Sequence, residues 1–189
     1  YFIKNNEKDQ EIMKKKVAIN GFGRIGRLVF RAYLERSNEF NETYEISYIN
    51  DLADIDSNIH LLKYDSVHGA FGDEIQKTAD NKFKVGQNEI TVTSKKNPID
   101  LNWAEKEIDV ILECTGVFAS KEKALLHVES GAKKVVVSAP CTNADFTVVQ
   151  GVNHEKINSD HVIISNASCT TNCLSPVAYV IDKEFGIEN

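Results

Sequence analysis

The pattern of apolar and polar positions along the chain alternates between short strands and helices. Continuous apolar runs, typical of strands covered on both faces of a parallel sheet, lie at residues 17–20, 109–114, 135–138, 146–149 and 162–164. Shorter-range alternation predicts a strand over 44–51 and a hairpin over 82–92. Helical spacing predicts helices over 28–36, 56–64 and 174–185, and another from residue 120 onward. Strands that alternate with helices predict an open, doubly wound α/β fold with a mostly parallel sheet.

A glycine-rich turn links the first predicted strand to the first predicted helix. Gly21, Gly23 and Gly26 stand in a G-x-G-x-x-G pattern between them. In this context the first glycine makes the turn, the second lets a pyrophosphate approach the backbone, and the third lets helix and strand pack. The pattern therefore predicts a Rossmann-type fold that binds a dinucleotide.

An acidic residue ends the second predicted strand. Asp51 follows Gly26 by 25 residues, against about 20 in the usual fingerprint. A carboxylate here would accept hydrogen bonds from ribose hydroxyls and repel a 2′-phosphate, which favours NAD over NADP. Alternatively, Asp51 only caps the turn that follows it. Because ligands bind at the carboxyl ends of parallel strands, the same edge is expected to carry Thr115, Ser138 and Cys169.

Composition and charge narrow the class of protein. The 189 residues suffice for one domain, or for one domain and the start of another. A formal charge of -6 argues against nucleic acid or a membrane surface as a partner, and no apolar run approaches the roughly 20 residues of a membrane span. Four cysteines outside any loop-rich frame favour a reducing, cytoplasmic location. We interpret Met13 as the native start, residues 1–12 as vector-derived sequence or a short extension, and residues 1–13 as outside the first domain.

A cysteine among small polar residues marks a second candidate site. Cys169 stands near the predicted junction between the strand at 162–164 and the helix at 174–185. Unpaired backbone N–H groups and the helix dipole favour an anion at such a junction. Three interpretations compete: a packed core thiol, a metal ligand together with Cys173, or a nucleophile. One C-x-x-x-C pair supplies only two of the four ligands that structural zinc takes, so no metal is expected. A core position suits Cys173 better than Cys169, whose neighbours are polar.

A nucleophilic cysteine needs more than a helix terminus. An ordinary cysteine thiol, with a pKa of about 8.5, is only about 3% thiolate at pH 7. A helix N-terminus contributes roughly 0.3–1 kcal/mol, and at most about 2 kcal/mol, which corresponds to about one pKa unit. Full activation therefore requires a base or a cation. None of the five histidines stands in an obvious partner position in the sequence.

Four stretches carry a family resemblance: residues 16–27, 50–52, 62–69 and 165–173. Together they resemble the phosphorylating glyceraldehyde-3-phosphate dehydrogenases. The resemblance implies NAD as cofactor, glyceraldehyde 3-phosphate and inorganic phosphate as substrates, and a homotetrameric enzyme of glycolysis. It implies that Cys169 attacks the aldehyde to give a hemithioacetal, that hydride passes to NAD, and that phosphate cleaves the resulting thioester to 1,3-bisphosphoglycerate.

The resemblance also assigns residues by their position. Contacts with the cofactor are implied for the pyrophosphate-loop residues Arg24 and Ile25, the ribose ligand Asp51, the adenine neighbour Lys96, and Thr115 and Ser138. The attacking phosphate is implied to lie beside the thiol, at Ser168 and Thr170. Residues 14–168 would form the NAD-binding domain, and residues 169–189 would begin a catalytic domain.

The chain departs from the family pattern at its C-terminal end. In the family, a histidine base and further phosphate ligands lie beyond this point, which accounts for the missing partner of Cys169. This chain alone is therefore expected to show no catalytic turnover. An apolar face is also expected to be exposed and prone to association. A second hypothesis is a module that only binds NAD or a partner protein. Within the enzyme class, the similar erythrose-4-phosphate dehydrogenase is the alternative.

Overall fold

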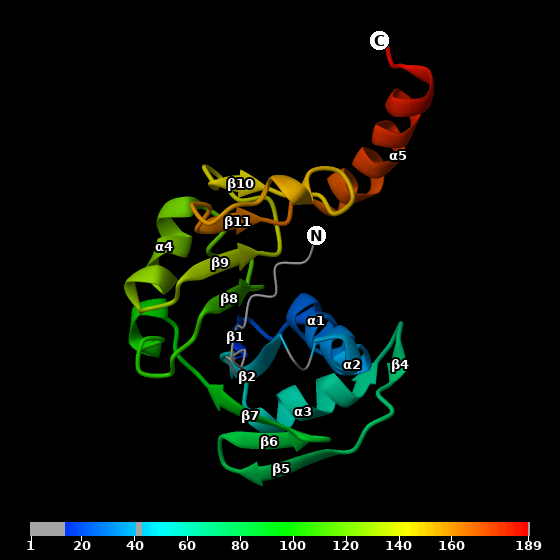
Figure 1. Ribbon diagram of the computed structural model, residues 1–189. Helices are drawn as coiled ribbons and strands as arrows, with labels where there is room; N and C mark the ends of the chain where they lie inside the picture. The colour runs from blue at the N-terminus through cyan, green and yellow to red at the C-terminus, as the bar shows by residue number, and fades with distance from the viewer. Residues whose placement is uncertain (1–13, 41–42, 189) are drawn as a thin grey trace, which may run out of the picture.

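The computed structural model describes residues 14–40 and 43–188, and the extension proposed for residues 1–13 lies outside them (Figure 1). Its strands are β1 (Lys15–Asn20), β2 (Tyr44–Asn50), β3 (Tyr64–Asp65), β4 (Gly69–Ala70), β5 (Ile75–Ala79), β6 (Lys82–Val85), β7 (Asn88–Thr93), β8 (Val110–Glu113), β9 (Lys134–Val137), β10 (Phe146–Thr147) and β11 (Ile163–Ser165). Its helices are α1 (Arg24–Glu35), α2 (Ser37–Phe40), α3 (Ile55–Lys63), α4 (Lys121–Glu129) and α5 (Cys169–Phe185), with short 3-10 turns η1 (Pro98–Leu101) and η2 (His154–Lys156).

One nine-stranded sheet organises the molecule, in the order β10-β11-β9-β8-β1-β2-β7-β6-β5. Every pair from β10 to β7 is parallel, whereas β6 and β5 continue the sheet antiparallel. The predicted Rossmann-type, doubly wound α/β fold is thus confirmed. The sequence pattern predicted the hairpin of β6 and β7 but not β5, whose side chains are mostly exposed and therefore show no apolar alternation.

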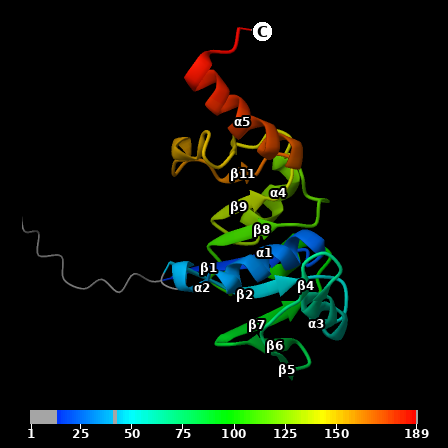
Figure 2. The ribbon, with the colours of Figure 1, turned by 90° about the vertical axis from the view of Figure 1, so that its right-hand side faces the viewer.

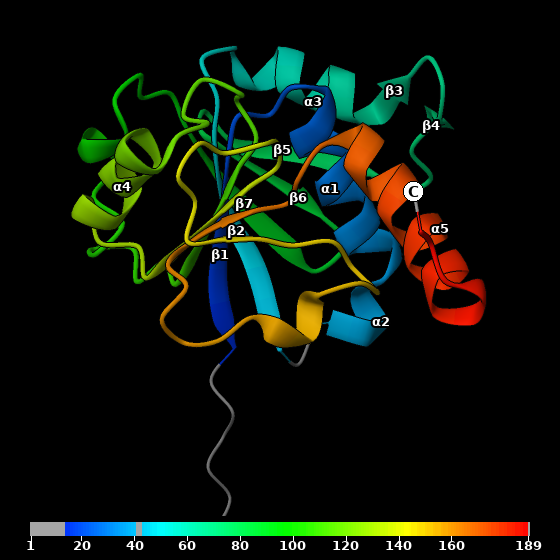
Figure 3. The same cartoon turned by 90° about the horizontal axis from the view of Figure 1, so that it is seen from above.

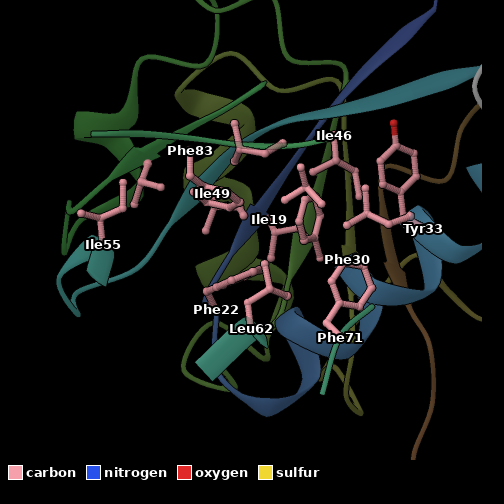
Figure 4. Close-up of a cluster of buried hydrophobic side chains, with 14 of the residues drawn as sticks. Ile19, Phe22, Phe30, Tyr33, Ile46, Ile49, Ile55, Leu62, Phe71 and Phe83 are labelled. Atoms are coloured by element: carbon pink, nitrogen blue, oxygen red, sulfur yellow. The ribbon is translucent and has the colours of Figure 1, made fainter. Parts of the chain in front are cut away.

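Helices cover both faces of the sheet, as the views from the side and from above show (Figures 2 and 3). On one face, α1 and α3 enclose a core that includes Ile19, Phe30, Ile49 and Phe83 (Figure 4). On the other face, α4 encloses a second core around Trp103. Since the central strands are buried on both sides, their apolar runs lack alternation.

The last helix extends away from the sheet beyond β11 (Figure 1). It begins at Cys169, five residues before the predicted start, because the Ser168 side chain caps it by accepting a hydrogen bond from the Thr171 N–H. None of the residues of α5 is buried. The expected core position of Cys173 is therefore wrong for this chain, since its thiol is exposed.

The exposed side of α5 is rich in apolar side chains, among them Leu174, Val177, Val180, Ile181 and Phe185. Phe185 is 85% exposed and Leu174 67%. An exposed apolar face is thus present, and it lies on this helix.

Candidate functional site

The glycine-rich turn packs tightly at its first and third glycines and is open at its second. Gly21 has a φ of +91°, and a methyl group on it would lie 2.7 Å from the Thr115 nitrogen. A methyl group on Gly26 would lie 2.1 Å from the Gly21 carbonyl oxygen. Gly23, the N-cap of α1, has no atom within 4 Å of such a methyl group and no side-chain cap bond. The N-terminus of α1 therefore has no side-chain cap and leaves room beside Gly23, as an anion site requires.

A pocket of about 480 Å³ lies beside this turn, at the carboxyl ends of β1, β2, β7 and β8. Five predicted residues line it: Gly21, Gly23, Asp51, Lys96 and Thr115. Seven more that the sequence analysis did not assign complete the lining: Asn20, Asn50, Leu52, Lys95, Cys114, Val117 and Phe118. The structure thus brings the strand-end residues Gly21, Asp51 and Thr115 into one cavity, whereas Ser138 and Cys169 lie outside its lining.

Asp51 is tied to the backbone on two sides. Its Oδ2 accepts a hydrogen bond of 2.6 Å from the Phe22 N–H, and its Oδ1 accepts one of 2.9 Å from the Ala53 N–H. The second bond is the turn cap that was the alternative interpretation. A carboxylate offers about four acceptor positions, so the contacts with the backbone leave room for ribose hydroxyls.

Four other residues that the sequence analysis assigned to the cofactor do not line the pocket: Arg24, Ile25, Gly26 and Ser138. Gly26 packs under the turn, and Ile25 is 48% exposed at the start of α1. Arg24 Nη1 lies 3.4 Å from Asp65 Oδ2. Hydrogen bonds from the backbone of the β3–β4 turn, with a smaller contribution from Arg24, hold the pKa of Asp65 below its usual value.

Ser138 follows β9 and contacts the pocket residue Cys114. Burial raises the pKa of the Cys114 thiol to about 11, and its hydrogen bond with Ser138 opposes that rise. Cys114 is therefore an inert, protonated thiol at neutral pH, unlike a nucleophile.

Cys169 is exposed and is the first residue of α5. The Ser168 hydroxyl lies 2.9 Å from the Thr170 hydroxyl, so the three predicted residues of the thiol site lie together. Before them, the buried Ala167 adopts a φ of +56°, a left-handed conformation that is unfavourable for alanine. Such local strain clusters at functional sites, and here it directs the chain from β11 into the helix.

Within the described residues, the Cys169 thiol has no hydrogen-bonding partner. The histidines are engaged elsewhere: His127 with Glu113 and Trp103, and His154 and His161 as acceptors of backbone N–H groups. His60 and His68 are exposed on and after α3, as expected. The described residues thus provide a helix terminus for the Cys169 thiol but no base beside it.

A metal-ligand cluster and a membrane-spanning helix are both absent from the described part of the chain. No group of three or more His, Cys, Asp and Glu side chains there is arranged to hold a metal ion. No helix among residues 14–40 and 43–188 has the length and apolar character needed to cross a bilayer.

Comparison with known proteins agrees with this geometry. Residues 15–121 match the family model described as glyceraldehyde 3-phosphate dehydrogenase, NAD binding domain. The chain is 52% identical over 176 residues to glyceraldehyde-3-phosphate dehydrogenase of Xanthobacter flavus, covering 93% of this chain and 51% of that protein. It is 50% identical over 173 residues to the enzyme of Mycoplasma pneumoniae, covering 91% of this chain and 50% of that protein.

A third relative is glyceraldehyde-3-phosphate dehydrogenase of Geobacillus stearothermophilus, which is 49% identical over 176 residues, with 93% of this chain and 51% of that protein covered. The chain therefore spans about half the length of the curated relatives it matches. With its fold, its glycine-rich turn and a family model that covers most of the sheet, the chain belongs to the glyceraldehyde-3-phosphate dehydrogenase family and carries that family's NAD-binding domain.

Proposed function

We propose that this chain is the NAD-binding part of an enzyme that oxidises and phosphorylates glyceraldehyde 3-phosphate, and that it carries the nucleophile. The observation that supports this most directly is the position of two sites on one sheet edge. The pocket beside Asp51 follows β2, and Cys169 follows β11, four strands away. Four strand spacings amount to about 19 Å, a span suited to an extended dinucleotide lying across the strand ends.

The residues present fit a dinucleotide in this orientation. The open N-terminus of α1 at Gly23 would hold the pyrophosphate, with Arg24 and Ile25 beside it. Asp51 would accept the ribose hydroxyls, and Lys96 would border the adenine. Contacts nearer the thiol would come from Thr115 and Ser138, which follow the next strands toward β11.

Cys169 would act as a covalent catalyst. Its thiolate adds to the aldehyde carbon to form a hemithioacetal, and loss of a hydride leaves a thioester. NAD, when bound, accepts that hydride and so supplies the oxidation. Phosphate held by Ser168 and Thr170 attacks the thioester, forms the acyl phosphate and releases the Cys169 thiolate.

The proposed division of the chain follows the same geometry. Residues 14–168 would form the NAD-binding domain, and residues 169–189 would begin the catalytic domain. The lack of any buried residue in α5 supports this division. Since the thiol has no base among the described residues, we propose that this chain alone binds NAD without turnover. The homotetramer and the cytoplasmic location of the whole enzyme are further parts of the proposal.

Titration of NAD into the purified chain by calorimetry tests the binding proposal. We expect one site, and an affinity about tenfold lower in Asp51→Ala, since that variant loses the ribose acceptor. Equal affinities would contradict the assigned contact. Turnover is tested with NAD, glyceraldehyde 3-phosphate and phosphate, with Cys169→Ser as control. A wild-type rate near that of ordinary enzymes would contradict the proposed inactivity of the chain alone.

A further inference from the structure

A continuous set of buried hydrogen bonds lies directly beneath the cofactor pocket. Its central members are Glu113 at the end of β8 and His127 on α4, which are 1% and 0% exposed. Asn20 and Asn50, at the ends of β1 and β2, are buried beside them. Buried polar groups of this kind are costly unless every one is paired, so their arrangement calls for an explanation.

The Glu113 carboxylate is surrounded by donors. Its Oε1 accepts hydrogen bonds from the Thr115 N–H, at 2.8 Å, and from the Thr115 hydroxyl. Its Oε2 accepts from Asn20 Nδ2 at 2.6 Å and pairs with His127 Nε2 at 2.9 Å. Both oxygens of Glu113 are thus engaged, Oε1 by Thr115 and Oε2 by Asn20 and His127.

Trp103 fixes the tautomer of His127. The indole N–H can only donate, and it lies 3.1 Å from His127 Nδ1, which must therefore accept and carry no proton. The ring proton is thus on Nε2 and points to Glu113, so His127 is a neutral donor. It follows that the approach of Asn20 Nδ2 to His127 Nε2, at 3.4 Å, joins two donors and is no hydrogen bond.

The same network reaches the opposite wall of the pocket. Asn20 Oδ1 accepts a hydrogen bond of 2.8 Å from Asn50 Nδ2. Asn50 in turn bonds both backbone groups of Lys95, with Nδ2 to the carbonyl oxygen at 2.9 Å and Oδ1 to the N–H at 2.8 Å. The wall at Thr115 and the wall at Lys95 are therefore joined through Glu113.

We propose that Glu113 is a positioning residue for the cofactor, and that His127 holds its carboxylate in place from below. Neither residue lines the pocket. Both act through Thr115 and Asn20, which do, by setting the width of the cavity before the ligand arrives. Preorganisation of this kind strengthens binding because less ordering remains to be done in the complex. The proposal rests on NAD binding at this pocket.

Glu113→Gln tests the proposal, because an amide nitrogen would meet the donors of Asn20 and His127. The matched control is Asp145→Asn. Asp145 is another largely buried carboxylate, which accepts hydrogen bonds from the Val162 and Ile163 N–H groups and pairs with Lys121, and neither Asp145 nor Lys121 lines the pocket. We expect Glu113→Gln to weaken NAD binding about tenfold or more at a temperature where the variant is folded. Asp145→Asn should lower the melting temperature but leave the affinity unchanged.

Equal affinity in folded Glu113→Gln and wild type would overturn the positioning role, whereas absence of NAD binding to the wild type would instead contradict the proposed function. A second pair of variants acts from below the pocket. His127→Phe should weaken NAD binding, and His127→Gln should restore it, since a glutamine can accept from Trp103 and donate to Glu113. Wild-type affinity in both would overturn the role of His127.

NMR of the wild-type chain tests the same proposal without relying on the folding of any variant. The His127 Nε2–H proton, observed by NMR, should shift when NAD saturates the pocket, although His127 does not line it. An unchanged signal at saturation would overturn the coupling between this network and the cofactor.

Discussion

Asp51 Oδ2 lies 2.6 Å from the backbone nitrogen of Phe22, and the acid at the end of β2 thereby fastens the glycine-rich turn at the end of β1. In the sequence these are two separate signals. In the fold they form one unit, because the parallel pairing of β1 and β2 ends with Asn20 opposite Asn50. A change at Asp51 is therefore expected to alter both the proposed ribose contact and the geometry of the turn.

Asp51→Asn keeps an acceptor for the Phe22 N–H and removes the negative charge. Since a carboxylate repels a 2′-phosphate, the affinity for NADP relative to NAD should rise about tenfold, or about 1.4 kcal/mol. The measurement is calorimetric titration of both dinucleotides. Asp54→Asn is the control, because Asp54 caps α3 through the Ser57 N–H and does not line the pocket. A preference that changes equally in both variants would exclude the assigned role of Asp51.

Alanine substitutions at Gly26 and Gly23 should have different effects, because Gly26 is closely packed and Gly23 lies in open space. Gly26→Ala places a methyl group 2.1 Å from the Gly21 oxygen, and overpacking of this kind costs about 1–3 kcal/mol of stability. Gly23→Ala meets no atom within 4 Å, so it should fold normally yet weaken NAD binding, because the methyl group occupies the approach to α1. Gly72→Ala, also in open space, should change neither quantity. Thermal melting and NAD titration distinguish the three.

Alkylation should distinguish the cysteines by their surroundings. Cys169 and Cys173 are both exposed, but only Cys169 stands at the first position of α5, beside the N–H groups that have no partner within the helix and attract negative charge. Iodoacetamide at pH 7, followed by mass spectrometry over time, should label Cys169 before Cys173, with the half-buried Cys114 after both. Cys169→Ser should remove the fastest phase. Faster labelling of Cys173 would refute the assignment of the nucleophile.

Cys114 should make the stability of the chain depend on pH in the alkaline range. Burial raises its folded-state pKa from 9.0 to about 11. Below pH 9 the thiol is neutral in both states, so its favourable contribution is fully present. Between about pH 9 and 11 the unfolded chain loses its proton first, and roughly 2–3 kcal/mol of stability should be lost as the pH rises. Urea unfolding of wild type and Cys114→Ala across this range should show a shallower decline in the variant.

The exposed apolar side of α5 should cause association between molecules. Phe185→Glu places a charge at the most exposed apolar position of the helix and should shift sedimentation toward the monomer. Val67→Glu is the matched control, since Val67 is 71% exposed in the β3–β4 turn, away from α5. Sedimentation that is unchanged by Phe185→Glu would show that α5 does not mediate the association.

Local patterns in the sequence determined the fold class and the strand ends that build the site. A glycine-rich turn after one apolar run and an acidic residue after the next were enough to predict the fold class. Backbone sterics and the burial of parallel strands on both faces leave their mark in short segments of sequence. The apolar spacing predicts a start of α5 at residue 174, five residues too late, because that spacing begins only after the capped first turn of the helix. Cys173 was assigned to packing because helical position alone does not say which faces are covered.

Only the tertiary structure shows which buried polar side chains lie beneath the pocket. Asn20 and Glu113 are 93 residues apart in the chain, and Trp103 and His127 are 24 apart, yet their side chains are in contact. No short-range pattern marks these residues, because Asn20 and Glu113 are single polar positions at the ends of apolar strands and His127 is one of several polar positions on α4. Their pairing follows from strand order and from the packing of α4 on the sheet. The sequence alone thus predicted a dinucleotide site and a candidate nucleophile, and only the fold joins the walls of the pocket through Glu113.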